Sequence, residues 1–204
     1  MKGKADMTTT EKLPMVTRAD WVPGPRQGLW TYDDYVALPD DGKRYEIVNG
    51  VLYMTPSPSG AHQDAVFRFS LHLFTHVEAA GLGKVRLAPF DVKLAPNRVV
   101  QPDVLIVLNA NYEKITDECI IGAPDLIVEV ASPGTAIYDR HDKLNLYAQA
   151  GVPEYWIADP ESRTVEVLVL QVGEYYSLGV YRGKAVLPSH TLPGFTTRVE
   201  QFFA

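Results

Sequence analysis

Apolar and polar residues alternate along the chain in runs that predict strands and helices in succession. The clearest signal is a hairpin, because two strand-like runs at 45–48 and 51–54 flank Asn49-Gly50, the dipeptide best suited to a type I′ turn. Apolar residues at helical spacing predict a long helix over 59–80, and Gly81 suits a left-handed cap at its end.

The other elements follow the same reasoning. A short helix is predicted over 32–38 and a longer one over 136–150, which Gly151 and Pro153 end. Strands are predicted over 84–94, 99–108, 125–130, 154–158, 164–170 and 175–181, with a short amphipathic end at 199–203. Strands that alternate with two substantial helices indicate an α/β or α+β fold with a mixed central sheet flanked by helices.

Residues 1–29 lack a sustained period and contain a threonine run and several prolines. We therefore expect a flexible N-terminal tail over 1–29. The chain has 204 residues, of which 46% are hydrophobic, which is enough for one sizeable core. A single domain over 30–204 is the expected organisation.

Composition narrows the class of protein. No stretch is apolar for the roughly 18 residues of a membrane span, so we expect a soluble protein. The single cysteine, Cys119, cannot form an internal disulfide, and no apolar signal core is visible, which favours a cytoplasmic location. A formal net charge of -6 argues against a protein that coats nucleic acid by charge alone, but it allows an enzyme with a local basic groove.

One glutamate interrupts the apolar run of 125–130. Glu129 stands among residues typical of a central strand, where an ionised group needs a partner or a metal. Asp103 lies inside the start of the preceding predicted strand, and a period of two sets Gln101 on the same face. If the two strands are neighbours, the carboxylates of Asp103 and Glu129 converge.

Two hard oxygen ligands at the ends of adjacent strands suit Mg²⁺ or Mn²⁺. Each residue also has a structural explanation. Asp103 suits a strand start, where its carboxylate would accept nearby N–H groups. Glu129 suits a buried ion pair with an arginine.

The next predicted helix carries a stripe at four-residue spacing, formed by Asp139, Lys143 and Tyr147. Because this helix directly follows Glu129, Lys143 is placed to point back at the carboxylates. The alternative is an ordinary surface pair of Asp139 with Lys143, with Tyr147 in the core.

At these residues the sequence resembles the putative restriction endonuclease family of the PD-(D/E)XK nuclease superfamily. The resemblance covers the chain from about residue 30 onward and depends on the order and spacing of many short motifs. These motifs are Tyr45-Glu46, Asn49-Gly50, 59–63, 89–92, Gln101-Pro102-Asp103, 122–126, Glu129-Val130, Ser132-Pro133, Asp139, Lys143, Tyr147, 151–157 and 192–195.

The resemblance implies roles for particular residues. Asp103 and Glu129 match the metal ligands of the superfamily, with the Val130 backbone carbonyl as a third. The superfamily lysine, two positions after the acidic residue, is replaced here by Ala131, and Lys143 matches the position to which the family is thought to have moved it.

Three supporting residues also match the family. Glu46 matches an early glutamate that holds a second metal or a water, or else it is a strand-face residue paired with Arg44 or Lys43. Gln101 is expected to bond substrate, metal-bound water or a ligand side chain. His62 resembles a recurring family histidine, and a hydrogen-bonded helix-start residue is the alternative.

The resemblance thus implies an endonuclease that uses Mg²⁺ or Mn²⁺ to hydrolyse phosphodiester bonds in double-stranded DNA, as a homodimer. Candidate phosphate contacts are Arg140, His141, Lys93 and Arg98. A catalytically inactive nuclease-fold module for binding or assembly is the main alternative, and Ala131 and the negative net charge favour it. A glycosidase is a third hypothesis, since it also uses a carboxylate pair, but no aromatic sugar platform is evident.

Overall fold

The structure is a computed structural model that describes residues 15–132, 134 and 138–203, without the side chains of residues 139 and 140. Its strands are β1 (Thr17–Arg18), β2 (Arg44–Val48), β3 (Val51–Thr55), β4 (Gly83–Leu87), β5 (Asp91–Ala95), β6 (Arg98–Val100), β7 (Val104–Leu108), β8 (Cys119–Ile121), β9 (Leu126–Val130), β10 (Glu154–Asp159), β11 (Thr164–Gln171) and β12 (Glu174–Arg182). Its helices are α1 (Tyr32–Val36), α2 (Gly60–Leu73) and α4 (Leu144–Ala150), with π-helical turns η1 (Phe74–Glu78) and η3 (Asp139–Lys143) and 3₁₀ turns η2 (Asn109–Lys114) and η4 (Val199–Phe202).

The strands form two six-stranded sheets. The first has the order β1-β3-β2-β6-β5-β8, and the second has the order β12-β11-β10-β9-β7-β4. Both mix parallel and antiparallel pairs, since β5 pairs with β8 and β9 pairs with β10 in parallel. The predicted α+β class is confirmed, but the strands divide between two sheets where one central sheet was expected.

This division arises at two prolines. The predicted strand 84–94 separates into β4 and β5 around Pro89, and the predicted strand 99–108 separates into β6 and β7 around Pro102. A proline has no N–H to donate to a ladder, so the strand ends there and the chain passes to the other sheet. The prediction of one continuous strand carrying both Gln101 and Asp103 is therefore wrong.

The hairpin is formed as predicted. Asn49 and Gly50 have φ of 50° and 76°, the left-handed values of a type I′ turn, between β2 and β3. The predicted long helix is confirmed as α2 followed by η1, with Phe69, Leu73 and Val77 fully buried. The second helix is η3 followed by α4, and Gly151 ends it with a φ of 82°.

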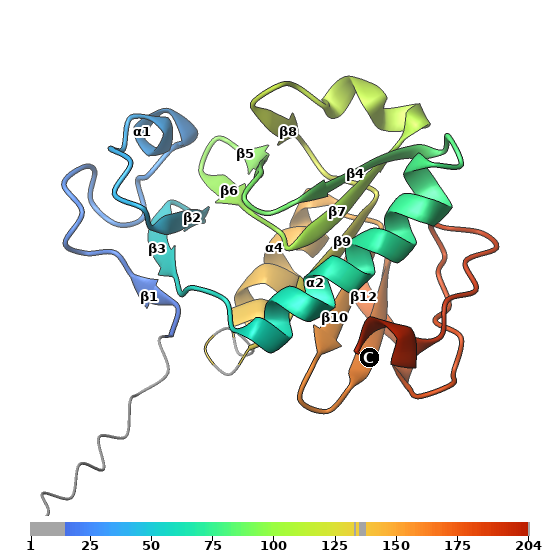
Figure 1. Cartoon of the computed structure of the whole chain (residues 1–204). Coiled ribbons are helices and arrows are strands. Elements are labelled where there is room, and N and C mark those ends of the chain that lie inside the picture. The colour runs from blue at the N-terminus through green and yellow to red at the C-terminus, as the bar shows by residue number, and fades with distance from the viewer. Residues whose placement is uncertain (1–14, 133, 135–137, 204) are drawn as a thin grey trace, which may run out of the picture.

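Period two along the second sheet separates its two faces. Val104, Ile106, Leu126 and Val128 pack under α2, which crosses this sheet in Figure 1. The alternate residues of the same strands face the other way, toward α4 and the inner face of the first sheet. A smaller cluster covers the opposite face of the first sheet and includes Trp30, Tyr45 and Ile47.

Part of the predicted tail belongs to the folded core. Residues 1–14 lie outside the described residues, but β1 pairs with β3, and Ala19 is fully buried. Backbone hydrogen bonds join this segment to the hairpin, from Ala19 N to Leu52 O (2.9 Å) and from Gly28 N to Gly50 O (2.7 Å). A segment held by such contacts needs no periodic pattern, which is why the pattern did not reveal it. Within the described part of the chain, no helix is both long and apolar enough to cross a bilayer.

Candidate functional site

Glu129 faces the space between the two sheets. Its neighbours Val128 and Val130 pack on the α2 side of the second sheet, so Glu129 points to the opposite side, where α4 lies. This alternation brings a carboxylate into a region that is otherwise apolar. The side chain is 3% exposed and therefore requires partners.

The η3–α4 segment supplies those partners. Lys143 Nζ lies 2.8 Å from Glu129 Oε1, and the Tyr147 hydroxyl donates to the same oxygen at 2.6 Å. Lys143 and Tyr147 are four residues apart, so they lie on the same side of the helical segment and can both contact Glu129. Burial and the charge of Glu129 hold the pKa of Tyr147 well above its usual value, so its hydroxyl stays a donor.

Lys143 also reaches the first sheet. Its ammonium lies 3.1 Å from Glu46 Oε1, so one buried cation joins a glutamate from each sheet. Glu46 and Lys143 are 1% and 4% exposed. Of the alternatives for Glu46 and Glu129, pairing with a basic side chain is realised for both, and the cation shown is Lys143.

Asp103 lies beside Glu129 across the strand pair. In the antiparallel pairing of β7 with β9, Val104 is opposite Val128, so one further step of the register sets Asp103 opposite Glu129. Asp103 Oδ2 accepts the Val130 N–H at 2.9 Å. The expectation that neighbouring strands bring these carboxylates together is confirmed.

His62 holds Asp103 from the start of α2. Its Nε2 is 3.1 Å from Asp103 Oδ2 and donates to it, because the carboxylate only accepts. Burial alone would raise the pKa of Asp103, but the hydrogen bond and charge of His62 act against it. The Val130 N–H and the charge of Lys143 add to that effect, so the pKa of Asp103 is lowered.

Gln101 connects the site to the first sheet. Its backbone N–H donates to Glu46 Oε1 at 2.8 Å, and its amide oxygen accepts from Arg44 Nε at 3.1 Å. Its amide nitrogen donates to Asp91 Oδ1 at 2.9 Å and to the Tyr35 hydroxyl at 3.0 Å. Gln101 thus orients other side chains of the site.

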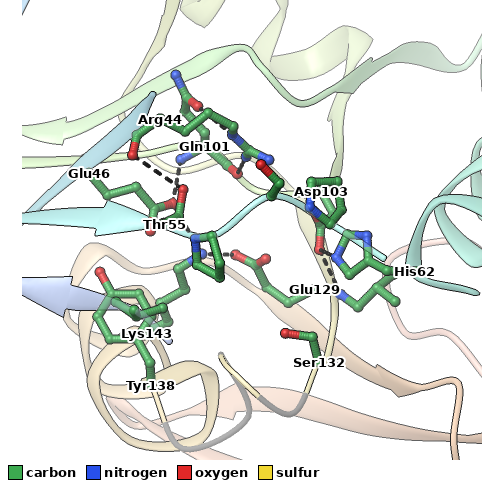
Figure 2. A pocket seen from close by; sticks show the side chains of 15 residues that line it. Arg44, Glu46, Thr55, His62, Gln101, Asp103, Glu129, Ser132, Tyr138 and Lys143 are labelled. Atoms are coloured by element: carbon green, nitrogen blue, oxygen red, sulfur yellow. Dashed lines mark hydrogen bonds and ion pairs between the residues drawn. The ribbon is translucent and has the colours of Figure 1, made fainter. Parts of the chain in front are cut away.

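These side chains border one hollow between the sheets, as Figure 2 shows. Its lining residues are Val16, Arg44, Glu46, Thr55, Pro56, Ser57, Pro58, His62, Gln101, Asp103, Glu129, Val130, Ser132, Tyr138 and Lys143. All residues predicted for catalysis, metal binding and support are among them. Arg44 is also among them, although the sequence suggested it only as a possible partner of Glu46.

Three of the four candidate phosphate contacts lie outside the hollow. Lys93 stacks over the Tyr32 ring at 4.6 Å, and Arg98 donates to Asn49 (2.8 Å) and Gln149 (2.7 Å). Neither these two residues nor His141 lines the hollow. The side chains of Asp139 and Arg140 lie outside the described residues.

The oxygen atoms of the site are of the type that binds a hard divalent cation. Three carboxylates border the hollow, and Glu46 Oε2 is a buried oxygen with no hydrogen-bond partner within the described ranges. No three His, Cys, Asp or Glu side chains among the described residues are already clustered as a metal site. The Lys143 ammonium lies within 3.1 Å of Glu46 and 2.8 Å of Glu129, so it pairs with both glutamates that border the hollow.

Comparison with known proteins identifies the family. The profile of the Uma2 family, described as "Putative restriction endonuclease", matches residues 32–200. The chain belongs to this family. Its similarity to the putative restriction endonucleases therefore extends over most of the sequence.

Two individual proteins resemble this Uma2 family member. An uncharacterized protein of Synechocystis sp. is 29% identical over 109 residues, which are 52% of this chain and 55% of that protein. The match thus spans about half the length of the curated relative. The crystal structure of a putative nuclease belonging to DUF820 from Anabaena variabilis has a TM-score of 0.72 at 19% identity, covering 85% of this chain and 97% of the other. This likeness shows that the two proteins share a fold.

Proposed function

We propose that this Uma2 family protein is a metal-dependent endonuclease that hydrolyses phosphodiester bonds in DNA. One observation carries the proposal: Asp103 and Glu129, from neighbouring strands, share a hollow with the Lys143 ammonium, 2.8 Å from Glu129. Family membership supplies the expected chemistry, since the family is described as putative restriction endonucleases.

The metal in this proposal is Mg²⁺ or Mn²⁺, held by Asp103, Glu129 and the Val130 backbone carbonyl. Carboxylate and carbonyl oxygens are the ligands that these ions prefer. A bound divalent cation supplies a water of lowered pKa and polarises the scissile phosphate.

The protein's own residues position the reacting groups. The Tyr147 hydroxyl and Lys143 fix the Glu129 carboxylate, while His62 and the Val130 N–H fix Asp103. The low pKa of Asp103 keeps it ionised and able to bind a cation at neutral pH. The Lys143 ammonium offsets the negative charge that develops on the phosphate during hydrolysis.

A calorimetric Mn²⁺ titration of the wild type, Asp103→Asn and Glu129→Gln tests the metal site. We expect the wild type to bind and both variants to lose binding, because each loses one anionic ligand. Asp117→Asn, at an exposed aspartate outside the hollow, is the matched control and should bind as the wild type does. Absence of binding in all four folded proteins would contradict the metal site.

Cleavage of supercoiled plasmid DNA in Mg²⁺ tests the activity. Wild type should nick or linearise the plasmid, and Lys143→Ala should lose at least about 100-fold in rate, as expected for a positioned charged group. Metal binding without cleavage of plasmid, linear duplex or single-stranded DNA would favour the inactive module.

The inactive module is a second candidate because the Lys143 ammonium already forms buried ion pairs with Glu46 and Glu129. We further propose that the protein acts on double-stranded DNA as a homodimer, because a duplex has two strands to cut. Light scattering of the purified protein tests the dimer. A cytoplasmic location and a single domain also belong to this proposal, and the domain includes residues 15–29, which pair with the hairpin.

A further inference from the structure

Arg44, a positively charged residue of the first sheet, lines the hollow. It begins β2, and Tyr45 and Ile47 of that strand pack into the core on the opposite face. Alternation therefore sets Arg44 on the same face as Glu46, and both residues line the hollow. In Figure 2, Arg44 lies beside Gln101 above the carboxylates.

The guanidinium is held in place without being neutralised. Its Nε donates to Gln101 Oε1 at 3.1 Å, and its Nη2 donates to the Gln101 carbonyl oxygen at 3.3 Å. Both acceptors are uncharged, and Arg44 forms no ion pair with a carboxylate of the described residues. Gln101 is in turn fixed by Tyr35 and Asp91, so the position of Arg44 is set through a network.

The hairpin brings two further hydroxyl-bearing residues to this hollow. Thr55 is opposite Arg44 in the register of β2 with β3, and its hydroxyl donates to the Arg44 backbone carbonyl at 3.4 Å, while Ser57 follows shortly after β3; both residues line the hollow. A planar guanidinium, with the Ser57 hydroxyl on the same hollow, matches the oxygens of a phosphodiester. The acidic side chains lie deeper, which separates an anion site from the proposed cation site.

We propose that Arg44, with Ser57, forms a phosphate-binding subsite for a substrate backbone phosphate next to the one that is cleaved. Gln101 is its positioning residue. This inference rests on the proposed function, since it assigns a contact to the same nucleic-acid substrate. The subsite would give a protein with a formal net charge of -6 a local positive charge with which to attract a phosphate.

The test is binding of a short fluorescent DNA duplex in EDTA, which prevents cleavage, over a series of salt concentrations. Loss of one phosphate contact should lower the slope of log affinity against log salt by about 0.9. We therefore expect Arg44→Gln to bind about 10-fold more weakly than wild type and to show that smaller slope. Arg182→Gln, on the exposed part of β12, removes the same charge and should leave both quantities unchanged.

Two further variants separate charge from position. Arg44→Lys keeps the charge but not the planar fork, so it should bind more weakly with the wild-type slope. Gln101→Met should weaken binding alone and add nothing in combination with Arg44→Gln, because it acts through Arg44.

The outcomes distinguish this inference from the proposed function. If Arg44→Gln shows the wild-type slope of log affinity against log salt, the subsite is overturned, whether or not the affinity falls. The proposed function still stands in that case, provided that the wild type binds DNA. Mn²⁺ titration of Arg44→Gln should match the wild type, since Arg44 is not a metal ligand. A wild type that binds no DNA at any salt concentration overturns both.

Discussion

Among single residues, Lys143 has the largest part in balancing the buried negative charges of the site. Its ammonium is the cation shown between Glu46 and Glu129, two carboxylates that come from different sheets and are almost fully buried. A divalent cation at Glu129 would compete with this ammonium for the same oxygen. The metal-free protein thus depends on Lys143 for stability, while metal binding requires part of that pairing to loosen.

Lys143→Met should lower the free energy of unfolding by about 3–5 kcal/mol without metal, because it leaves buried carboxylates uncompensated. Added Mn²⁺ should recover more stability in this variant than in wild type, since no ammonium competes for Glu129. Urea unfolding with and without Mn²⁺ measures both effects. Lys184→Met, an exposed lysine, is the control for the change in net charge. Equal metal stabilisation of Lys143→Met and wild type would contradict the competition.

Asp103 makes the stability depend on pH. Its pKa is lowered in the folded protein, whereas an aspartate in the unfolded chain titrates near about 3.9. The folded state therefore binds fewer protons near that pH, so this contribution is present above about pH 3.9 and is lost as pH falls through the folded pKa. Asp103→Asn should flatten the acid limb of a plot of unfolding free energy against pH. Parallel curves for the variant and wild type would show that another group controls that limb.

At the scale of elements, the β2–β3 hairpin carries Arg44 and Glu46 into the site and also anchors the N-terminal segment. Its turn residue Gly50 has a φ of 76°, and a Cβ there would lie 2.3 Å from the Gly28 carbonyl oxygen. The turn thus requires glycine at position 50 for two reasons: its backbone angle, and the close approach of the segment around Gly28.

Gly50→Ala should destabilise the protein by about 2 kcal/mol or more, because the added methyl is strained in angle and meets backbone. Chemical denaturation measures the change. Gly60→Ala, at the first residue of α2, meets nothing within 4 Å and is the matched control, with an expected change of no more than about 1 kcal/mol. A Gly50→Ala protein as stable as Gly60→Ala would show that the hairpin tolerates a shift of residue 28.

At the scale of the whole molecule, the site exists because two sheets face each other across α4. Glu46 comes from one sheet and Asp103 and Glu129 from the other, and Lys143 bridges them. The segment from Met15 to Trp30 supports the first sheet from its outer face, at the hairpin that carries Glu46. Val16 of this segment also lines the hollow, so its removal should affect the site both directly and through the hairpin.

Deletion of residues 1–29 should cost at least about 3 kcal/mol of stability. Besides the β1–β3 ladder, three hydrogen bonds to the hairpin are lost, from Ala19 N, from Gly28 N and from Leu52 N to Gln27 Oε1, each contributing about 1 kcal/mol. Thermal unfolding of the full chain, of a chain lacking residues 1–14 and of one lacking 1–29 separates the two parts. Equal stability of the two shortened chains would show that residues 15–29 act only as a tail.

The local elements and the charged residues of the site could be predicted from the amino-acid sequence alone. The Asn49-Gly50 turn, the α2 periodicity and the charged residues in apolar strands depend on interactions between near neighbours, which a pattern reveals directly. Asp103, Glu129 and Lys143 stood out because an ionised group in an apolar run is costly without partners. Family motifs supported the same residues.

The distribution of the strands between two sheets and the partner of each charged group follow from the folded structure and not from any local pattern. Pro89 and Pro102 end strands, but no local signal states that the chain then crosses to another sheet. Three contacts join segments far apart in the sequence. They are the ion pair of Lys143 with Glu46, the hydrogen bond of Arg44 with Gln101, and the packing of residues 15–29 on the hairpin. Such contacts depend on the register of strands and on burial, which are properties of the folded chain as a whole.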